Sequence, residues 1–277
     1  MLLYHLSILL SASIVVVIPI QASSVSERTT YPNFCQLATI QEDIFLNFRQ
    51  AAATKWIVET VSYEEGWAML QYIAQEHPHL VPFLEKISKS DKLGNPTVYN
   101  YPPFGSFCPT TLRYVKIAGD LQREFTNLSS LNILEIGGGY GGQCKILNDI
   151  EGFSSYTIVD LPECTPLIAK YLNCHQLTNT KCIDSVNVKE EMHCDLLISN
   201  YAFSELDKID QLNYINLIID FAPMGYMTYN LDPSAFNNIN SLTVDEVRAA
   251  LSSKNRTVKV EPENPPTGEH TFVIIWY

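Results

Sequence analysis

Basic residues and glycines are both scarce in this chain of 277 residues. Lys and Arg number 18 against 30 Asp and Glu, the formal net charge is −12 at pH 7, and the basic residues form no cluster. Because nucleic acids are normally bound by a basic patch, we expect no nucleic-acid partner but a small or neutral ligand. Only 12 residues are glycine, yet five of them fall within positions 137–142. That concentration predicts a backbone turn that a ligand approaches closely.

Metal-binding cysteine spacing is absent as well. The number of cysteines is odd, none of them forms a C-x-x-C motif, and their density is far below that of a disulfide scaffold. We therefore expect no zinc site but isolated buried thiols, above all at Cys144 and Cys194 beside predicted strands. The seven cysteines stand at positions 35, 108, 144, 164, 174, 182 and 194.

A single long hydrophobic run occupies residues 6–20, and Ala-Ser-Ser at positions 22–24 follows it. The run is shorter than the roughly 20 residues of a spanning helix, and the small residues fit a cleavage site. We therefore predict residues 1–24 to be a signal peptide or a membrane anchor, which would place the chain in the secretory pathway or at a membrane. Because no Lys or Arg precedes the run, a cytoplasmic location stays the alternative.

Hydrophobic periodicity predicts a helical cap region over residues 30–125. Ile40, Ile44, Phe48 and Ala52 recur at helical spacing, and a capping box at residues 62–65 opens another helix. Further helices are expected over 80–87 and 111–125, with turn-rich loops at 88–96 and 99–105.

Residues 126–277 show a different pattern, in which short apolar runs alternate with amphipathic helices. This alternation predicts an α/β domain with a Rossmann-like, mostly parallel sheet that ends in an antiparallel hairpin. The expected strands are 133–136, 156–160, one ending at 184, 195–199, 225–229, 258–261 and 270–277, with helices from about 141, 162, 207 and 243.

Two cofactors compete for the glycine-rich turn. Gly137-x-Gly139-x-x-Gly142 satisfies the dinucleotide fingerprint, with Asp160 at the end of the next strand for a ribose, and would indicate an NAD-dependent oxidoreductase. Read instead as Glu135-x-Gly137-x-Gly139-x-Gly141, the turn resembles the first motif of class I S-adenosylmethionine-dependent methyltransferases. A carboxylate at 135 favours a cationic cofactor and repels a pyrophosphate.

That resemblance implies S-adenosylmethionine as the cofactor and a sheet whose antiparallel last strand is inserted among parallel ones. It implies that Asp160 binds the ribose, or else caps the following helix, and that Asp184 binds the adenine, or else is a solvated loop residue. The cofactor-binding set implied in this way is Glu135, Gly137, Gly139, Gly141, Asp160, Leu161, Asp184 and Asn200.

Several segments together resemble one narrower family, the sugar O-methyltransferases among bacterial glycan-modifying proteins. The resemblance spans about residues 92–277 and implies methyl transfer to a sugar hydroxyl of a glycan. The alternatives are the NAD-dependent oxidoreductase and a non-catalytic, glycan-binding descendant of the fold. The matching segments are G-N-P (94–96), T-L-R-Y (111–114), L-E-I-G-G-G-Y-G-G (134–142), D-L-P (160–162), S-N-Y-A-F-S-E-L (199–206) and the terminal I-I-W-Y.

A sugar hydroxyl is a very weak acid, so its proton requires a general base or a metal. Glu205 is the preferred base, although a carboxylate there could simply favour a helix N-terminus, and His270 is the second candidate. Glu205 and Asp232 could hold a divalent metal, but no local ligand spacing requires one. Because parallel strands end at the ligand crevice, polar residues after strand ends are expected to bind the acceptor. They are Tyr201, Ser204, Asn230 and Asp232, joined by Arg113 and Tyr114, which could form a lid with Tyr99, Tyr101 and Phe104.

Overall fold

The computed structural model describes residues 24–231 and 239–277. The helices are α1 Tyr31–Ile40, α2 Glu42–Phe45, α3 Ala52–Ile57, α4 Tyr63–Glu76, α5 Leu84–Ser90, α6 Pro109–Glu124, α7 Gly142–Ile150, α8 Thr165–Cys174, α9 Lys208–Leu217 and α10 Val244–Ser252. The strands are β1 Tyr99–Tyr101, β2 Gly105–Phe107, β3 Asn132–Ile136, β4 Ser155–Asp160, β5 Thr180–Asp184, β6 Leu196–Asn200, β7 Met224–Asn230, β8 Val258–Pro262 and β9 Thr271–Trp276.

Seven strands form one sheet in the order β5-β4-β3-β6-β7-β9-β8. The five strands from β5 to β7 pair in parallel, whereas β9 lies antiparallel between β7 and β8. The dinucleotide-binding order has the first five strands in the same arrangement but continues with a sixth at the edge. The inserted antiparallel strand is the feature expected of the class I methyltransferase fold, and this fold prediction is confirmed.

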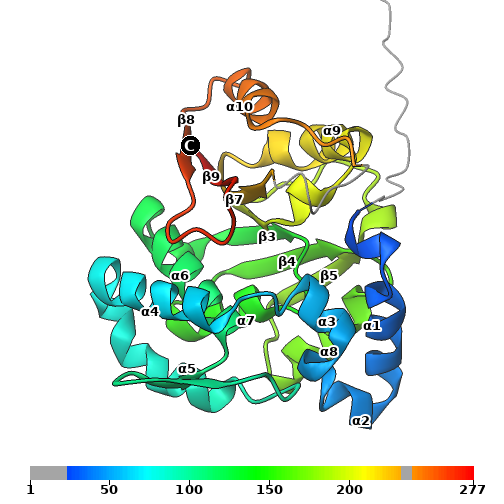
Figure 1. Ribbon diagram of the computed structural model, residues 1–277. Helices are drawn as coiled ribbons and strands as arrows, with labels where there is room; N and C mark the ends of the chain where they lie inside the picture. Colours follow the sequence, from blue (N-terminus) through cyan, green and yellow to red (C-terminus); the bar gives the residue numbers. More distant parts are fainter. Residues whose placement is uncertain (1–23, 232–238) are drawn as a thin grey trace, which may run out of the picture.

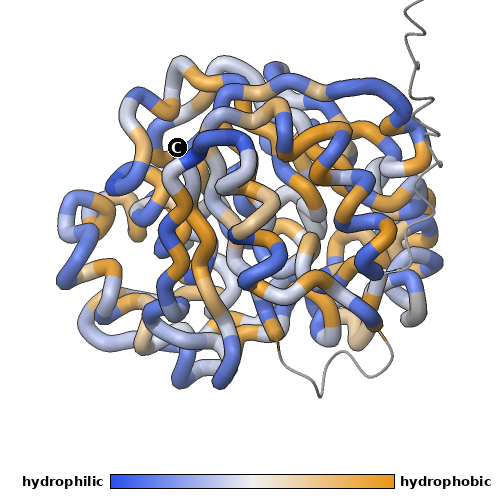
Figure 2. The backbone as a smooth tube through the Cα atoms, turned by 90° about the horizontal axis from the view of Figure 1, so that it is seen from above, coloured by the Kyte–Doolittle hydropathy of each residue, from blue (hydrophilic) through white to orange (hydrophobic). Residues whose placement is uncertain are grey.

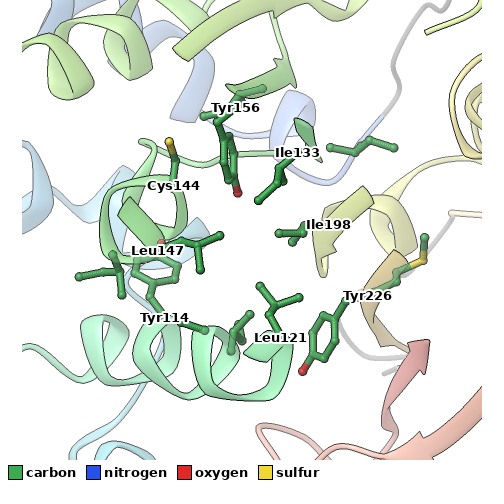
Figure 3. Packing of buried hydrophobic residues seen from close by; sticks show 14 of the residues in the cluster. Tyr114, Leu121, Ile133, Cys144, Leu147, Tyr156, Ile198 and Tyr226 are labelled. Carbon is green, nitrogen blue, oxygen red and sulfur yellow. The ribbon is translucent and has the colours of Figure 1, made fainter. Parts of the chain in front are cut away.

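Helices cover both faces of the sheet. Helices α6, α7 and α8 lie on one face and α9 and α10 on the other, while α4 packs outside α6 and α1 outside α8 (Figure 1). Hydrophobic stretches run through the interior, and hydrophilic ones are concentrated at the periphery (Figure 2). The sheet face toward α6 and α7 presents Tyr156, Ile133, Ile198 and Tyr226, which point toward helix residues that include Leu121 (Figure 3). Burial of such large side chains stabilises a fold by about 1.5 to 3 kcal/mol each.

Most predicted elements exist, but the expected continuous helix through Ile40 and Ala52 is wrong. The chain leaves the helical conformation at Gln41, which has φ −110° and ψ 115°, and short helical segments replace the continuous one. Arg49 N–H donates to the carbonyl of Gly94 instead of to its own helix. The loop predicted at residues 99–105 contains part of a short antiparallel hairpin, β1 and β2.

A buried ionic cluster fixes the helical region to the glycine-rich turn. The Arg49 guanidinium is fully buried and forms ion pairs with Glu59 and Asp91. Its carbon lies 4.9 Å from the ring centroid of Tyr140, the non-glycine residue of the turn. Because an unpaired buried charge is very costly, these contacts define how the helices sit against the sheet.

Candidate functional site

The glycine-rich turn follows β3. Its backbone conformation requires glycine at positions 137 and 139, and at position 137 there is also no space for a side chain. Gly137 has φ +76° and Gly139 has φ +60°, in the region that side chains rarely adopt. A Cβ on Gly137 would overlap the side chain of Ala202, which belongs to the segment after β6. The two strand-end segments therefore meet with no side chain between them, and the backbone of the turn is left open to a cavity.

Asp160, the last residue of β4, holds this turn in place. Its Oδ2 accepts a hydrogen bond of 2.8 Å from Gly138 N–H, and its Oδ1 accepts one of 2.7 Å from Leu161 N–H. Burial raises the pKa of Asp160 to about 6, although these backbone donors work in the opposite direction. Each carboxylate oxygen keeps a further lone pair for a ligand hydroxyl.

Glu135 lies at the end of β3, only 2% exposed, and also lines the cavity. Tyr156 O–H donates to its Oε2 at 2.9 Å. Burial, with a smaller contribution from the charge of Asp160, raises the pKa of Glu135 to about 8 despite that hydrogen bond. A cation in the cavity would stabilise the ionised form of this carboxyl group.

The cavity has a volume of about 360 Å³, within the usual range for small-molecule sites. Its two sides differ in origin, and we name them the strand wall and the cap wall. The strand wall is made by Glu135, Gly137, Gly138, Gly139, Asp160, Asn200, Tyr201, Ala202, Glu205 and Asn230. The cap wall is made by Trp56, Ile57, Val58, Thr60, Val61, Glu65, Arg113 and Tyr114.

Glu205 lies on the strand wall in the segment that follows β6. Burial raises its pKa to about 7, and the nearby Arg113 guanidinium limits the rise. A carboxyl group with such a pKa can accept a proton near neutral pH. Among the titratable residues predicted for catalysis, Glu205 is the one that the structure places on the cavity.

Tyr201 connects the two walls. Its backbone has φ +68°, which is unusual for a residue with a side chain. The ring lies 5.2 Å from the guanidinium carbon of Arg113, which also donates to the Val58 carbonyl at 3.0 Å. Tyr201 O–H donates to buried Glu263 in the loop before β9, at 2.7 Å. These contacts hold the strand wall and the cap wall on opposite sides of the cavity.

Asn200 provides a buried donor that faces the same region. Its side-chain Nδ2 is buried and has no hydrogen-bond partner among the residues that the structure describes. Such a group costs free energy unless something satisfies it. A polar atom of a ligand in the cavity would do so, which fits the prediction that Asn200 binds the cofactor.

The amino-terminal segment covers part of the site. Val25 N–H donates to the Glu205 carbonyl, Ser24 pairs with Leu206, and Tyr31 O–H donates to the Gly139 carbonyl at 3.2 Å. Val25, Ser26 and Tyr31 therefore line the cavity beside the strand wall. The predicted leader itself lies outside the described residues except for Ser24.

A narrow recess of about 50 Å³ adjoins the cavity at Asp160 and Glu205. Leu161 lines it as predicted for a cofactor contact, but Asp184 lines neither space. Thr165 O–H donates to Asp184 Oδ1 at 2.5 Å, and Asn187 donates to its Oδ2. Asp184 therefore faces neither the cavity nor the recess, whereas its neighbour Ser185, whose buried hydroxyl has no hydrogen-bond partner among the described residues, lines the recess.

Several other predicted site residues also lie elsewhere. Gly141 lies close to Leu172 and is the N-cap residue before α7, so it shapes the turn without lining the cavity. Ser204 is buried and donates to the Tyr201 carbonyl, which is a structural role. His270, the second residue predicted as a base, is exposed and does not line the cavity. Asp232 lies outside the described residues, as does any metal site that would include it.

The aromatic lid predicted beside Arg113 and Tyr114 is likewise corrected. Arg113 and Tyr114 line the cavity, whereas Tyr101 is buried and stacks on Trp67 and Tyr63 in the helical region. Tyr99 and Phe104 contact the same aromatic group. Their hydrophobic surface packs the β1–β2 hairpin against α4, which the sequence pattern could not distinguish from a lid.

Some lining residues were missed by sequence reasoning. Trp56, Thr60 and Thr267 carry no motif, and Glu65 was predicted only as part of a capping box. The loop that contains Thr267 reaches the site because Glu263 accepts hydrogen bonds from the N–H and O–H groups of Thr267. Over the described ranges, no group of three metal-binding side chains is found, and no helix has the length and apolar character needed to cross a membrane. The seven cysteines, all described, are free thiols; Cys144 and Cys194 are buried as expected.

No model of a known protein family and no curated protein sequence matches the chain. Solved methyltransferase structures are similar to it over 57 to 60% of its length. One from Aquifex aeolicus, a SAM-dependent methyltransferase, is 18% identical with a TM-score of 0.43 and is covered over 88% of its own chain. Magnesium protoporphyrin IX methyltransferase from Synechocystis PCC 6803, with bound SAH, is 9% identical with a TM-score of 0.49 and 82% covered. A Mesorhizobium loti SAM-dependent methyltransferase is 14% identical with a TM-score of 0.45 and 94% covered. At these values the strand order of this chain is the firmer evidence for its fold.

Proposed function

We propose that this chain is an S-adenosylmethionine-dependent O-methyltransferase that acts on a sugar hydroxyl. The observation that carries the cofactor proposal is the convergence of Glu135, Asp160 and Glu205 on one cavity, each with a raised pKa. Carboxyl groups placed together in this way favour a cationic ligand, because a cation lowers the cost of ionising them. S-adenosylmethionine carries an ammonium and a sulfonium group.

The same surroundings argue against a dinucleotide. A pyrophosphate normally binds at the N-terminus of the helix that follows the glycine-rich turn. Here Tyr140, Gly141 and Gly142 are buried, and the ring of Tyr114 fills the space beside Gly142. The helix end is therefore closed, and the nearest open surface carries carboxyl groups that would repel phosphate.

The residues present fit S-adenosylmethionine. Glu135 would face its ammonium group, Asp160 would accept from the ribose hydroxyls, and Asn200 Nδ2 would gain a missing partner. Leu161 and Ser185 would border the adenine in the recess. When bound, this cofactor supplies an electrophilic methyl group.

Glu205 would take the acceptor proton. A carboxyl group with a pKa of about 7 is a stronger base than an exposed glutamate, yet is still ionised in part near neutral pH. Arg113 on the cap wall favours its charged form. The two walls would orient the hydroxyl toward the methyl donor. A sugar acceptor is supported by the polar cap-wall groups and by the family resemblance of the sequence segments.

A thermal-shift titration tests the cofactor. S-adenosylmethionine and S-adenosylhomocysteine should raise the melting temperature, and NAD should not, because only a ligand of the native state stabilises it. Asp160→Asn should abolish the shift. Asp184→Asn is the matched control, since Asp184 pairs with Asp160 in the β4–β5 register but lies outside the cavity.

Other outcomes would identify the alternatives. Stabilisation by NAD alone would indicate an oxidoreductase and overturn the interpretation of Glu135. Stabilisation by the adenosyl compounds, with no methyl transfer to any glycan, would indicate a non-catalytic descendant of the fold. In the second case Glu205→Gln would change nothing measurable beyond stability.

A further inference from the structure

The indole of Trp56 is the most exposed large hydrophobic side chain that the structure describes. It is 81% exposed on the short helix α3, and yet it lines the cavity. The other two tryptophans of the chain differ: Trp276 is fully buried and Trp67 is partly buried against the core. A single exposed apolar residue needs no explanation, but one on the edge of a polar cavity offers a flat binding surface.

Polar groups surround this surface. Thr60 and Glu65 lie on the same wall, and Ser62 N–H fixes Glu65 by donating to its Oε2 at 2.7 Å. Thr267 lies at the cavity on the loop before β9. An aromatic face beside hydroxyl and carboxylate groups matches a sugar ring, which has an apolar face of C–H bonds and hydroxyls around its edge.

The charge of the lining restricts the kind of sugar. Among the described lining residues, carboxyl groups occur at Glu65, Glu135, Asp160 and Glu205, while Arg113 is the one cation. Arg113 donates to the neutral Val58 carbonyl and Thr60 Oγ1 and so keeps its charge. Because four carboxyl groups stand against this one cation, the lining as a whole disfavours a negatively charged sugar.

We propose that Trp56 is the stacking platform of an acceptor subsite for an uncharged sugar ring at the mouth of the cavity. The inference deepens the proposed function and depends on it for the sugar acceptor. A ring placed on Trp56 would position the next part of the glycan between the cap wall and Glu205. Trp56 is therefore a binding residue that sets specificity and takes no part in proton transfer.

The test measures glycoside binding in the presence of S-adenosylhomocysteine. The probes are the methyl glycosides of glucose, galactose, mannose and N-acetylglucosamine, with methyl glucuronide as the charged counterpart of the glucoside. At least one neutral glycoside should protect Trp56 fluorescence from acrylamide, and the glucuronide should bind more weakly. Isothermal titration calorimetry would measure binding in the variants, which lack this fluorophore: Trp56→Ala should weaken it about tenfold, as the loss of an aromatic anchor does, and Trp56→Phe should recover much of it.

Two controls separate this subsite from the cofactor site. Tyr99→Ala removes another exposed aromatic residue, outside the lining, and should leave glycoside binding unchanged. Trp56→Ala should keep the full thermal shift with S-adenosylhomocysteine. If S-adenosylhomocysteine does not raise the melting temperature of the unmodified chain, the proposed function is wrong. The fluorescence experiment still tests the subsite in that case. Three results would overturn the proposal. They are an unchanged glycoside affinity in Trp56→Ala, no protection of Trp56 fluorescence by any glycoside, and protection by phosphatidylcholine vesicles but not by glycosides.

Discussion

The strand wall and the cap wall enclose one cavity but are built by different physical means. The strand wall consists of strand ends and a glycine turn, and backbone N–H groups of Gly138 and Leu161 hold its central carboxylate. The cap wall consists of side chains from α3, α4, α6 and the connection between α3 and α4, a region whose position depends on buried ion pairs such as Arg49 with Asp91. We conclude that the sheet preorganises the strand wall, whereas the positions of the cap-wall side chains depend on how the helical region packs.

Removal of the base should have the largest effect. Glu205→Gln keeps the shape of the strand wall and removes its proton acceptor, so we expect kcat for methyl transfer to fall about 10²- to 10⁴-fold. The dissociation constant for S-adenosylhomocysteine should stay nearly constant, because the change is isosteric and this product lacks the sulfonium charge that a carboxylate would favour. Radiolabel transfer and calorimetry would measure the two quantities. An unchanged kcat would exclude Glu205 as the base.

The same residue predicts a pH profile. Glu205 has a pKa of about 7 and is active as the carboxylate, so kcat/KM for the acceptor should rise as the pH increases through about 7. Glu205→Gln should flatten this part of the profile, since glutamine does not titrate. A profile that keeps its rise in the variant would assign the titration to another group.

The cap wall can be disrupted without touching the cavity. Arg49→Met would leave Glu59 and Asp91 buried without their cation, and such a loss typically costs about 3 to 5 kcal/mol. Urea denaturation would measure the free energy of unfolding. Because Arg49 also lies over Tyr140, the affinity for S-adenosylhomocysteine should fall as well.

Two further variants decide whether charge is the cause. Lys89→Met breaks an exposed ion pair with Glu85 and should have no measurable effect on stability. Combining Arg49→Met with Glu59→Gln and Asp91→Asn removes all three charges and should recover much of the lost stability. A combined variant as unstable as the single one would mean that Arg49 acts through packing alone.

The two walls also differ in how far their residues could be predicted from sequence. Glu135 and Asp160 follow apolar runs, and parallel strands end at one edge, so their approach to each other followed from the pattern. Asp184 satisfied the same rule, but its side chain turns to Thr165. The residue that lines the recess is the next one along the chain, Ser185. The position of a strand end does not predict which of two neighbouring side chains faces a cavity, because side-chain direction depends on local packing.

The cap wall was largely beyond sequence reasoning. Trp56 and Thr60 lie between the helical spacing that ends at Ala52 and the capping box at residues 62–65, a stretch for which no element was predicted. Thr267 reaches the cavity through Glu263, whereas the more conspicuous His270 stays exposed. Long-range hydrogen bonds and ion pairs fix these positions, and no local periodicity encodes them.

The strand wall should make the protein less stable at higher pH when no cation is bound. Burial raises the pKa of Glu135 from 4.5 to about 8, so the native state holds a proton that the unfolded state has lost between these values. Stability from this group is complete below about 4.5 and is lost as the pH rises to about 8. Glu135→Gln should gain stability relative to the unmodified chain across this window, as measured by urea denaturation. An equal pH dependence in both proteins would contradict the raised pKa.

The smallest effect concerns the contact that joins the amino-terminal segment to the strand wall. Tyr31→Phe removes the hydrogen bond to the Gly139 carbonyl and leaves the ring in place. A neutral hydrogen bond contributes about 1 kcal/mol, so affinity for S-adenosylhomocysteine should fall at most about fivefold. Tyr277→Phe removes a hydroxyl that donates to Glu124, outside the cavity lining, and should leave affinity unchanged. Calorimetry on both variants would test the contact. If they bind alike, the amino-terminal segment only covers the site; if only Tyr31→Phe weakens binding, that segment helps to hold the glycine turn for its ligand.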